Sequence, residues 1–275
     1  PGTGAARRPH AVRGRPGCTG CPPTGKRVRG GAAEQRKKIT LERGGSEPGI
    51  VLADADIDEA AAAVRVGRFF NCGQACLATK RIFVEESVYD AFLEKLSAQA
   101  AKMKPGNGLD PASRMGPMHT STQRAEVESQ VKDALEKGAR IVYGGGRPEG
   151  EYFDKGNFLN AAVLAGVPSG SRMLTEEVFG PALPVVMVKD LDEAIRLAND
   201  SAYGLGSSIW TGSMASAFRA INEIEAGYTW VNSVQIAYDE LPFGGTKQSG
   251  FGKEHGVEAY HEYTEMKSVV VGGLS

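Results

Sequence analysis

From Lys38 onward, apolar residues recur with the two spacings that distinguish strands from helices. Short apolar runs bounded by glycine or polar residues predict strands over residues 39–41, 49–52, 81–84, 140–143, 183–188, 207–211, 228–231 and 268–271. Apolar positions three and four residues apart predict helices over residues 54–70, 87–103, 120–137, 191–199, 213–225 and 257–263. Because strands and helices alternate, the pattern favours an α/β fold, with a parallel-rich sheet and helices on both faces.

Polar residues just ahead of the apolar stripes predict where helices begin. Asp56 can cap the first predicted helix, and Ser87 is expected to cap the second. In the third predicted helix, the spacing of Val127, Val131 and Leu135 predicts that all three side chains point inward.

The first 31 residues differ in composition from the rest of the chain. They are rich in Gly, Pro and Arg and contain only scattered apolar residues. We do not expect such a segment to form a packed element, so it is interpreted as disordered or as the remnant of a larger domain. Ten basic residues and one acidic residue precede Leu41, and an arm of this kind could alternatively bind an anionic partner.

Overall composition narrows the function classes. The 275 residues are 41% hydrophobic and 24% charged with a formal net charge of -1, which gives no reason to expect nucleic acid or a membrane surface as a partner. No apolar run approaches the length of a membrane span, and no signal-peptide core is visible. Four cysteines are too few for a disulfide framework, so a reducing, cytoplasmic location is expected. The histidines are scattered, and no metal site is predicted.

Two stretches contain side chains suited to covalent chemistry. Residues 70–76 read Phe-Asn-Cys-Gly-Gln-Ala-Cys, which places Cys76 between a predicted helix and a predicted strand. Backbone N–H groups at such a junction could lower the pKa of Cys76 and stabilise an oxyanion, although spacing alone favours a buried packing cysteine. Glu42 ends a predicted strand ahead of two glycines, where its carboxylate could accept a proton. Taken alone, a surface glutamate is the commoner interpretation.

Two further stretches are turns or loops. Residues 176–181 read Glu-Glu-Val-Phe-Gly-Pro, which by itself indicates a solvated turn. Residues 241–252 read Leu-Pro-Phe-Gly-Gly-Thr-Lys-Gln-Ser-Gly-Phe-Gly, a glycine-rich loop without the spacing of a Walker or Rossmann phosphate loop. Composition alone predicts only that this loop is tight and closely packed.

Taken together and in this order, the four stretches resemble motifs of the aldehyde dehydrogenase superfamily. Residues 41–45 are similar to its L-E-L-G-G box, and residues 73–76 are similar to its G-Q-x-C box. Residues 176–181 match E-E-[IV]-F-G-P, and residues 242–252 match P-F-G-G-x-K-x-S-G-x-G. The likeness extends from about Gly20 to the C-terminus. It implies the catalytic domain of that family, with an additional C-terminal strand that serves oligomerisation.

The resemblance also implies a reaction, namely NAD- or NADP-dependent oxidation of a small aldehyde to a carboxylic acid. Cys76 would be the nucleophile that forms a thiohemiacetal and then a thioester, and Glu42 would be the base that activates the hydrolytic water. By the same resemblance, Glu177 would bind the nicotinamide ribose, Phe179 would pack against the nicotinamide side, and Phe243 would line the aldehyde channel.

A division of the chain follows from the same likeness. Residues 1–43 would be the arm and the remnant of a cofactor-binding domain, residues 44–252 the catalytic domain, and residues 253–275 a helix and an oligomerisation strand. The strand over residues 268–271 resembles the family's edge strand, which implies a homo-dimer or homo-tetramer for the intact protein.

Residues 19–25, Thr-Gly-Cys-Pro-Pro-Thr-Gly, resemble the end of the family's T-G-S-x-x-x-G phosphate loop. Gly20 and Gly25 would therefore help to bind the cofactor, and Cys21 stands where the family has serine. Arg43 stands where the family's L-E-L-G-G box, here called the glutamate box, has an apolar residue. If its cation lay beside Glu42, it would favour the charged carboxylate and weaken it as a base.

The family carries a large cofactor domain ahead of the glutamate box, whereas about forty residues precede that box here. This difference predicts a fragment, or a reading-frame shift near residue 18. Three alternatives to the full reaction follow: a non-catalytic fragment, a fragment that only hydrolyses esters at Cys76, and an acylating enzyme that passes the thioester to coenzyme A. Glu42 argues against the acylating type, because that chemistry needs no water-activating base.

Overall fold

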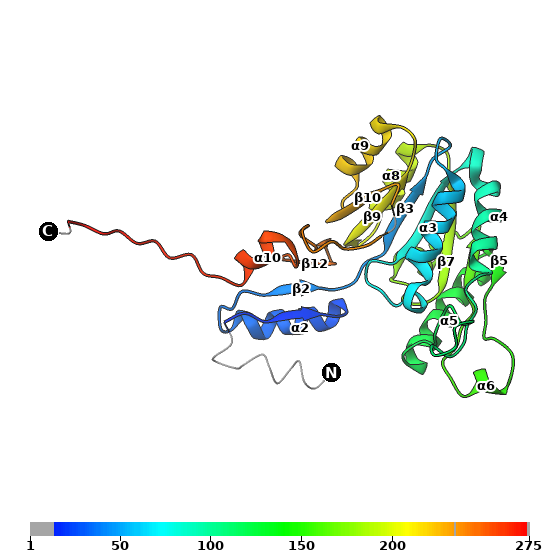
Figure 1. Cartoon of the computed structure of the whole chain (residues 1–275), viewed down its shortest axis with the longest axis horizontal. Coiled ribbons are helices and arrows are strands. Elements are labelled where there is room, and N and C mark those ends of the chain that lie inside the picture. Colours follow the sequence, from blue (N-terminus) through cyan, green and yellow to red (C-terminus); the bar gives the residue numbers. More distant parts are fainter. Residues whose placement is uncertain (1–13, 234, 274–275) are drawn as a thin grey trace.

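The computed structural model describes residues 14–233 and 235–273, and its centre is a seven-stranded sheet (Figure 1). The strand order is β10-β9-β3-β4-β7-β6-β5, and every neighbouring pair is parallel except β5 with β6. The strands are β3 (Glu47–Val51), β4 (Thr79–Glu85), β5 (Arg140–Gly144), β6 (Ala162–Ala165), β7 (Ala182–Val188), β9 (Gly206–Trp210) and β10 (Tyr228–Val231).

Helices cover both faces of this sheet, as the alternation of strands and helices predicts. One apolar cluster packs α3 (Ile57–Phe69), α4 (Tyr89–Ala100) and α5 (Ser121–Glu136) against one side. A second cluster packs α8 (Leu191–Asn199) and α9 (Met214–Glu223) against the other. The α/β class and the parallel-rich sheet with helices on both faces are therefore confirmed.

A smaller three-stranded sheet lies beside the main one, in the order β1-β2-β12. It contains β1 (Gly17–Thr19), β2 (Thr40–Glu42) and β12 (Gly250–Phe251), and α2 (Pro22–Ala33) packs on it. A two-stranded ribbon joins β8 (Tyr203–Gly204) to β11 (Thr246–Lys247). The remaining elements are the helices α6 (Glu151–Asp154), α7 (Arg172–Thr175) and α10 (Gly256–Glu262) and the 3-10 turns η1 (Phe70–Gly73) and η2 (Glu86–Val88).

The expectation that residues 1–31 form no packed element is wrong for residues 17–31, which contain β1 and most of α2. Pro22 starts the helix, as suits a residue that has no N–H to leave unpaired. Val28 and Ala32, four positions apart, are buried against Ile39 and Leu41. Two apolar residues among many Gly and Arg are too few to predict a helix from the sequence pattern. Residues 1–13 lie outside the described residues, and so does part of the predicted arm.

Of three local predictions, the cap at Asp56 is confirmed, and those for Ser87 and Leu135 are wrong. Asp56 caps α3 by accepting hydrogen bonds from two backbone N–H groups. Ser87 caps nothing, because it lies inside η2 and α4 begins after Val88. Leu135 is 38% exposed, because near the end of α5 it is Ala134 that packs into the core.

The predicted strand over residues 268–271 is absent from the described chain. After α10 the chain runs as an extended tail away from the body (Figure 1), and Val270 is 95% exposed. A strand needs a partner edge, and this tail has none within the single described chain. Its predicted part in oligomerisation remains a prediction. Among the described residues, no helix is long and apolar enough to cross a membrane.

Candidate active site

The small sheet around Glu42 joins three stretches that lie far apart in the sequence. Glu42 pairs with Thr19 of β1 on one side and with Gly250 of β12 on the other. Its carbonyl oxygen accepts a hydrogen bond from the N–H of Gly20 at 2.8 Å. The glutamate stretch therefore lies between the turn that precedes α2 and the glycine-rich loop over residues 242–252.

The carboxyl group of Glu42 is buried beneath that loop. The residue is 3% exposed, and neither carboxylate oxygen accepts a hydrogen bond of good geometry from the described part of the chain. Burial, together with the negative charge of Glu254, raises the pKa of Glu42 to about 8 against the opposing effects of Lys253 and the Gly245 N–H. A carboxyl group with this pKa can exchange a proton near neutral pH, as a general base requires.

Arg43 follows Glu42 in the sequence, but its side chain points elsewhere. A β-carbon added to Gly25 of α2 would overlap Cδ of Arg43 and lie 3.0 Å from its Cγ. The stem of Arg43 therefore packs over Gly25, which is buried. The charges that shift the pKa of Glu42 belong to Glu254 and Lys253, so Arg43 does not weaken Glu42 as a base.

The segment that carries Cys76 is a strained turn between α3 and β4. Asn71 and Cys72 both have left-handed backbone angles, with φ of 50° and 59°. The Asn71 amide donates to the carbonyl of Gln74 at 3.0 Å, and the Gln74 amide donates back to the carbonyl of Asn71 at 3.2 Å. Gln74 Oε1 also accepts from the N–H of His119 at 2.8 Å. The side chains of Asn71 and Gln74 thus hold the turn in place.

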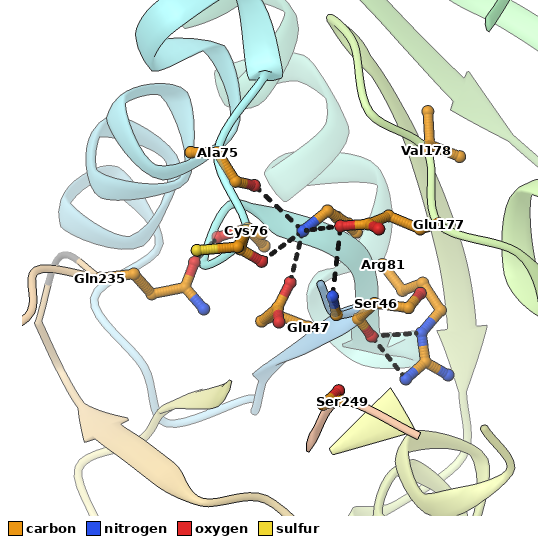
Figure 2. Close-up of polar contacts among 12 residues, drawn as sticks. Ser46, Glu47, Ala75, Cys76, Arg81, Glu177, Val178, Gln235 and Ser249 are labelled. Carbon is orange, nitrogen blue, oxygen red and sulfur yellow. Dashed lines mark hydrogen bonds and ion pairs between the residues drawn. The ribbon is translucent and has the colours of Figure 1, made fainter. Parts of the chain in front are cut away.

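A buried lysine, Lys80, holds the other end of this turn. Four residues that its ammonium contacts, Ala75, Cys76, Glu47 and Glu177, are labelled in Figure 2. Nζ of Lys80 donates to the carbonyl of Ala75 at 3.1 Å and to the carbonyl of Cys76 at 2.6 Å. The same ammonium lies 2.7 Å from Glu47 Oε2 and 3.3 Å from Glu177 Oε1. Glu177 Oε1 also accepts a hydrogen bond from the N–H of Gly45 at 3.2 Å. Lys80 therefore links the cysteine, the glutamate box and the Glu177 stretch.

The thiol of Cys76 does not have the lowered pKa expected for a cysteine at this junction, because other effects outweigh the backbone N–H. Burial and the nearby Glu47 carboxylate raise the pKa of the thiol, and Glu42 raises it further. Lys80 opposes these effects, and the hydrogen bond from Leu77 contributes the smallest lowering. The thiol is therefore mostly protonated near neutral pH and needs a group to take its proton before it can attack a carbonyl.

Cys76 opens onto a cavity of about 610 Å³. The thiol shares the walls with Glu177 and Phe179, and with Gly20 and Cys21 at the start of α2. The N-terminus of a helix attracts anions such as phosphate, and a carboxylate such as Glu177 can accept hydrogen bonds from sugar hydroxyls. The cavity therefore suits a nucleotide with a sugar near the thiol. Gly25, under Arg43, does not belong to the cavity lining.

Phe243 is 5% exposed and packs beside Tyr228 and His255, with ring centroids 6.0 and 6.1 Å apart. It is not among the residues that line the cavity at Cys76. The structure thus brings together Cys76, Glu177, Phe179 and Gly20 around one space. Glu42 lies beneath the adjacent glycine-rich loop, to which Phe243 itself belongs.

Sequence reasoning missed Lys80 and Glu47. A signal for them was present, because Lys80 and Arg81 are consecutive at the start of an apolar strand. Consecutive residues of a strand point to opposite faces, and both faces of this sheet are covered. At least one of the two cations therefore had to be buried, and a buried cation needs partners. Both are in fact buried, and their partners include Glu47 for Lys80 and the Ser46 carbonyl for Arg81.

With this geometry established, the chain can be compared with known proteins. The family model described as "Aldehyde dehydrogenase family" matches residues 17–269. A betaine aldehyde dehydrogenase of Brucella melitensis biotype 2 is 38% identical over 268 residues, which are 98% of this chain and 55% of that protein. The chain thus spans little more than half the length of the curated relatives it matches.

Solved structures give the same picture. The betaine aldehyde dehydrogenase of Staphylococcus aureus in complex with NAD+ superposes with a TM-score of 0.90 at 36% identity, over 94% of this chain and 52% of that one. A structure described as an NADP-dependent enzyme of E. coli gives a TM-score of 0.92 at 35% identity, over 96% of this chain and 54% of that one.

Proposed function

Because the chain belongs to the aldehyde dehydrogenase family, we propose that it carries the nucleophile, the base and the nicotinamide end of the cofactor site of an NAD(P)-dependent aldehyde dehydrogenase. The reaction is the oxidation of an aldehyde to a carboxylic acid. One observation carries the proposal: Cys76 and Glu177 open into the same cavity. The effect of Glu42, whose charge raises the pKa of the Cys76 thiol, supports it.

In the first step, the thiol of Cys76 loses its proton and the thiolate attacks the aldehyde carbon. Glu42 is the group to which we assign the proton, because its pKa of about 8 lies closer to that of a thiol than the pKa of an ordinary carboxyl group does. The carbonyl π bond breaks as the sulfur–carbon bond forms, so the product is the oxyanion of a thiohemiacetal.

The cofactor, when bound, supplies the acceptor for the hydride that leaves the thiohemiacetal carbon. Gly20 and the start of α2 suit its phosphates, Glu177 its ribose and Phe179 its ring, since these residues line the cavity beside Cys76. Loss of hydride leaves a thioester on Cys76. Glu42 next releases to solvent the proton that it took from the thiol. Its carboxylate then takes a proton from water, and the hydroxide attacks the thioester carbon to give the acid and the free thiolate.

Hydrolysis of an activated ester uses the same thiol and base but needs no hydride acceptor. Two assays therefore test the proposal. One measures hydrolysis of p-nitrophenyl acetate, and the other measures formation of reduced cofactor from betaine aldehyde plus NAD or NADP. Betaine aldehyde is the first substrate to try because relatives carry its name. Formation of reduced cofactor supports the full proposal, and ester turnover alone supports only the thiol and the base.

Cys72 provides a matched control for Cys76. It lies four residues earlier, is buried in the apolar core, and does not line the cavity. Cys76→Ala is expected to abolish turnover in both assays, whereas Cys72→Ala is expected to keep it. Turnover that survives Cys76→Ala, or a wild-type chain that turns over neither substrate, contradicts the proposal.

A further inference from the structure

The ammonium of Lys80 is completely buried, and four oxygen atoms converge on it. Two belong to the carboxylates of Glu47 and Glu177, at 2.7 and 3.3 Å, and two are the carbonyls of Ala75 and Cys76, at 3.1 and 2.6 Å (Figure 2). A lysine has three N–H donors, so these contacts use its hydrogen-bonding capacity fully. No part of this arrangement follows from the four sequence motifs.

The neighbouring buried cations have a different task. Arg68 donates to the carbonyls of Thr79 and Val178, and Arg81 donates to the carbonyl of Ser46. These contacts tie backbone to backbone and fix the scaffold. Lys80 instead joins backbone at the thiol to a carboxylate that lines the cavity.

The glycine turn after Glu42 completes the connection. A β-carbon at Gly44 would overlap the carboxylate of Glu177, and one at Gly45 would overlap the carboxylate of Glu47. Both carboxylates thus sit directly against the turn while they face the ammonium. If the ammonium moved, the two carboxylates would move with it and displace the Gly44–Gly45 turn, which follows Glu42 closely in the chain.

From this geometry we infer that Lys80 is a positioning residue, which holds the Cys76 turn, Glu177 and the Gly44–Gly45 turn in one fixed arrangement, with Glu47 as its counterion. The inference rests on the proposed function, because it assigns Lys80 a part in the reaction at Cys76. The buried ion pair of Lys80 and Glu47 would then serve the reaction as well as the fold.

A purely structural ion pair makes a different prediction from a positioning residue. Replacing a buried pair by apolar side chains of similar size is often neutral for stability. The charges themselves act in opposite directions on the thiol, because Glu47 raises its pKa and Lys80 lowers it. Removing both would therefore leave the thiol at least as easily ionised as before, with Glu42 as the remaining charge that faces it.

The test compares Lys80→Met, the double variant Lys80→Met/Glu47→Leu, and the control Lys132→Met. Lys132 is an exposed lysine of α5 that pairs only weakly with Glu136, at 3.6 Å. For each protein, acylation of Cys76 by p-nitrophenyl acetate is followed against pH, and thermal unfolding checks the fold. The midpoint of the pH profile reports the ionisation of the thiol. The plateau at high pH reports how well the thiolate and its surroundings are placed.

We expect the double variant to fold like the wild type and to keep or lower the midpoint, yet to lose at least about tenfold in the plateau rate, because a small displacement of a reacting group is costly. Alkylation by iodoacetamide, which needs only an exposed thiolate, is expected to keep its plateau. Lys132→Met is expected to match the wild type in every measurement.

Two failures are distinguishable. If the wild-type chain does not acylate at Cys76, the proposed function fails, and the part assigned to Lys80 fails with it. If the wild type acylates and the folded double variant reaches the same plateau, only the inference about Lys80 is overturned. A double variant that does not fold also overturns it, since the pair is then needed for the fold itself.

Discussion

The α-carbon of Gly73 faces the backbone of Gly180 so closely that a β-carbon on Gly73 would lie 2.6 Å from the carbonyl carbon of Gly180. Gly73 belongs to the turn that carries Cys76, and Gly180 follows Glu177 and Phe179 in the sequence. Gly73 also has a φ of 71°, in the left-handed region that favours glycine. Two independent reasons therefore keep a side chain out of this position.

Replacing Gly73 by alanine should separate these two reasons when it is compared with Gly146→Ala. Gly146 has a similar φ of 68°, but nothing lies within 4 Å of a β-carbon built there. Gly146→Ala should lower the free energy of unfolding by about 1–2 kcal/mol through backbone strain alone. Gly73→Ala should lower the free energy of unfolding by roughly 1–3 kcal/mol more, because the new methyl group would overlap backbone of Gly180, which cannot move aside as a flexible side chain can. Urea unfolding measures both, and equal losses would show that the contact with Gly180 is unimportant.

The sequence predicted the elements that depend on local pattern. The helix after Asp56 and the strands around Ile50 and Ile82 follow from capping and apolar spacing, and the structure contains them. The position of Cys76 between a helix and a strand also follows from local pattern. The motif resemblance, rather than any spacing, supplied the partnership of Cys76 with Glu42.

What depends on long-range packing could not be predicted. The direction of Arg43 is set by Gly25, eighteen residues earlier, and the raised pKa of Cys76 is set by burial and by Glu47. Lys80 meets Glu177 only because β4 and the chain before β7 converge at one end of the sheet. Neither a period nor a motif carries that information.

The contact between Arg43 and Gly25 predicts a strong coupling in a double-mutant cycle. Gly25→Ala alone should destabilise the protein by about 1–3 kcal/mol, because the new methyl group overlaps the stem of Arg43. In an Arg43→Ala background the same change should become neutral or stabilising by up to about 1 kcal/mol, since alanine favours helix over glycine. Denaturant unfolding of the four proteins gives the coupling, and additive effects would mean that the two residues do not touch.

Three cysteines should differ in reactivity in a fixed order. Cys21 is exposed, and its hydrogen bond with the Thr24 side chain lowers the pKa of its thiol. Cys76 is half-buried with a raised pKa, and burial raises the pKa of Cys72 to about 12. Limited iodoacetamide treatment near neutral pH should therefore modify Cys21 first, Cys76 more slowly and Cys72 hardly at all. Peptide mass spectrometry reads the order, and early modification of Cys72 would contradict its place in the core.

The raised pKa of Glu42 predicts a pH-dependent loss of stability. Its pKa rises from 4.5 to about 8 in the folded chain, so the folded state holds this proton more tightly than the unfolded state does. The resulting stability is fully present below about pH 4.5 and is lost as the pH rises through about 8. Relative to the wild type, Glu42→Gln should therefore gain stability over this window, by on the order of 5 kcal/mol at its upper end. Urea unfolding at several pH values measures this gain, with Glu34→Gln, a change at an exposed carboxylate, as the control.

Activity should respond to the same ionisation in the opposite sense. Only the charged form of Glu42 can accept a proton, so ester hydrolysis by the wild type should rise as the pH passes through about 8. Glu42 also raises the pKa of Cys76, so in Glu42→Gln the thiol should ionise at lower pH even though the deacylation step becomes slow. Acylation would then begin at lower pH while turnover falls, a pair of changes that loss of folding cannot produce. If acylation and turnover kept the wild-type pH profile, Glu42 would be neither the base nor a neighbour of the thiol.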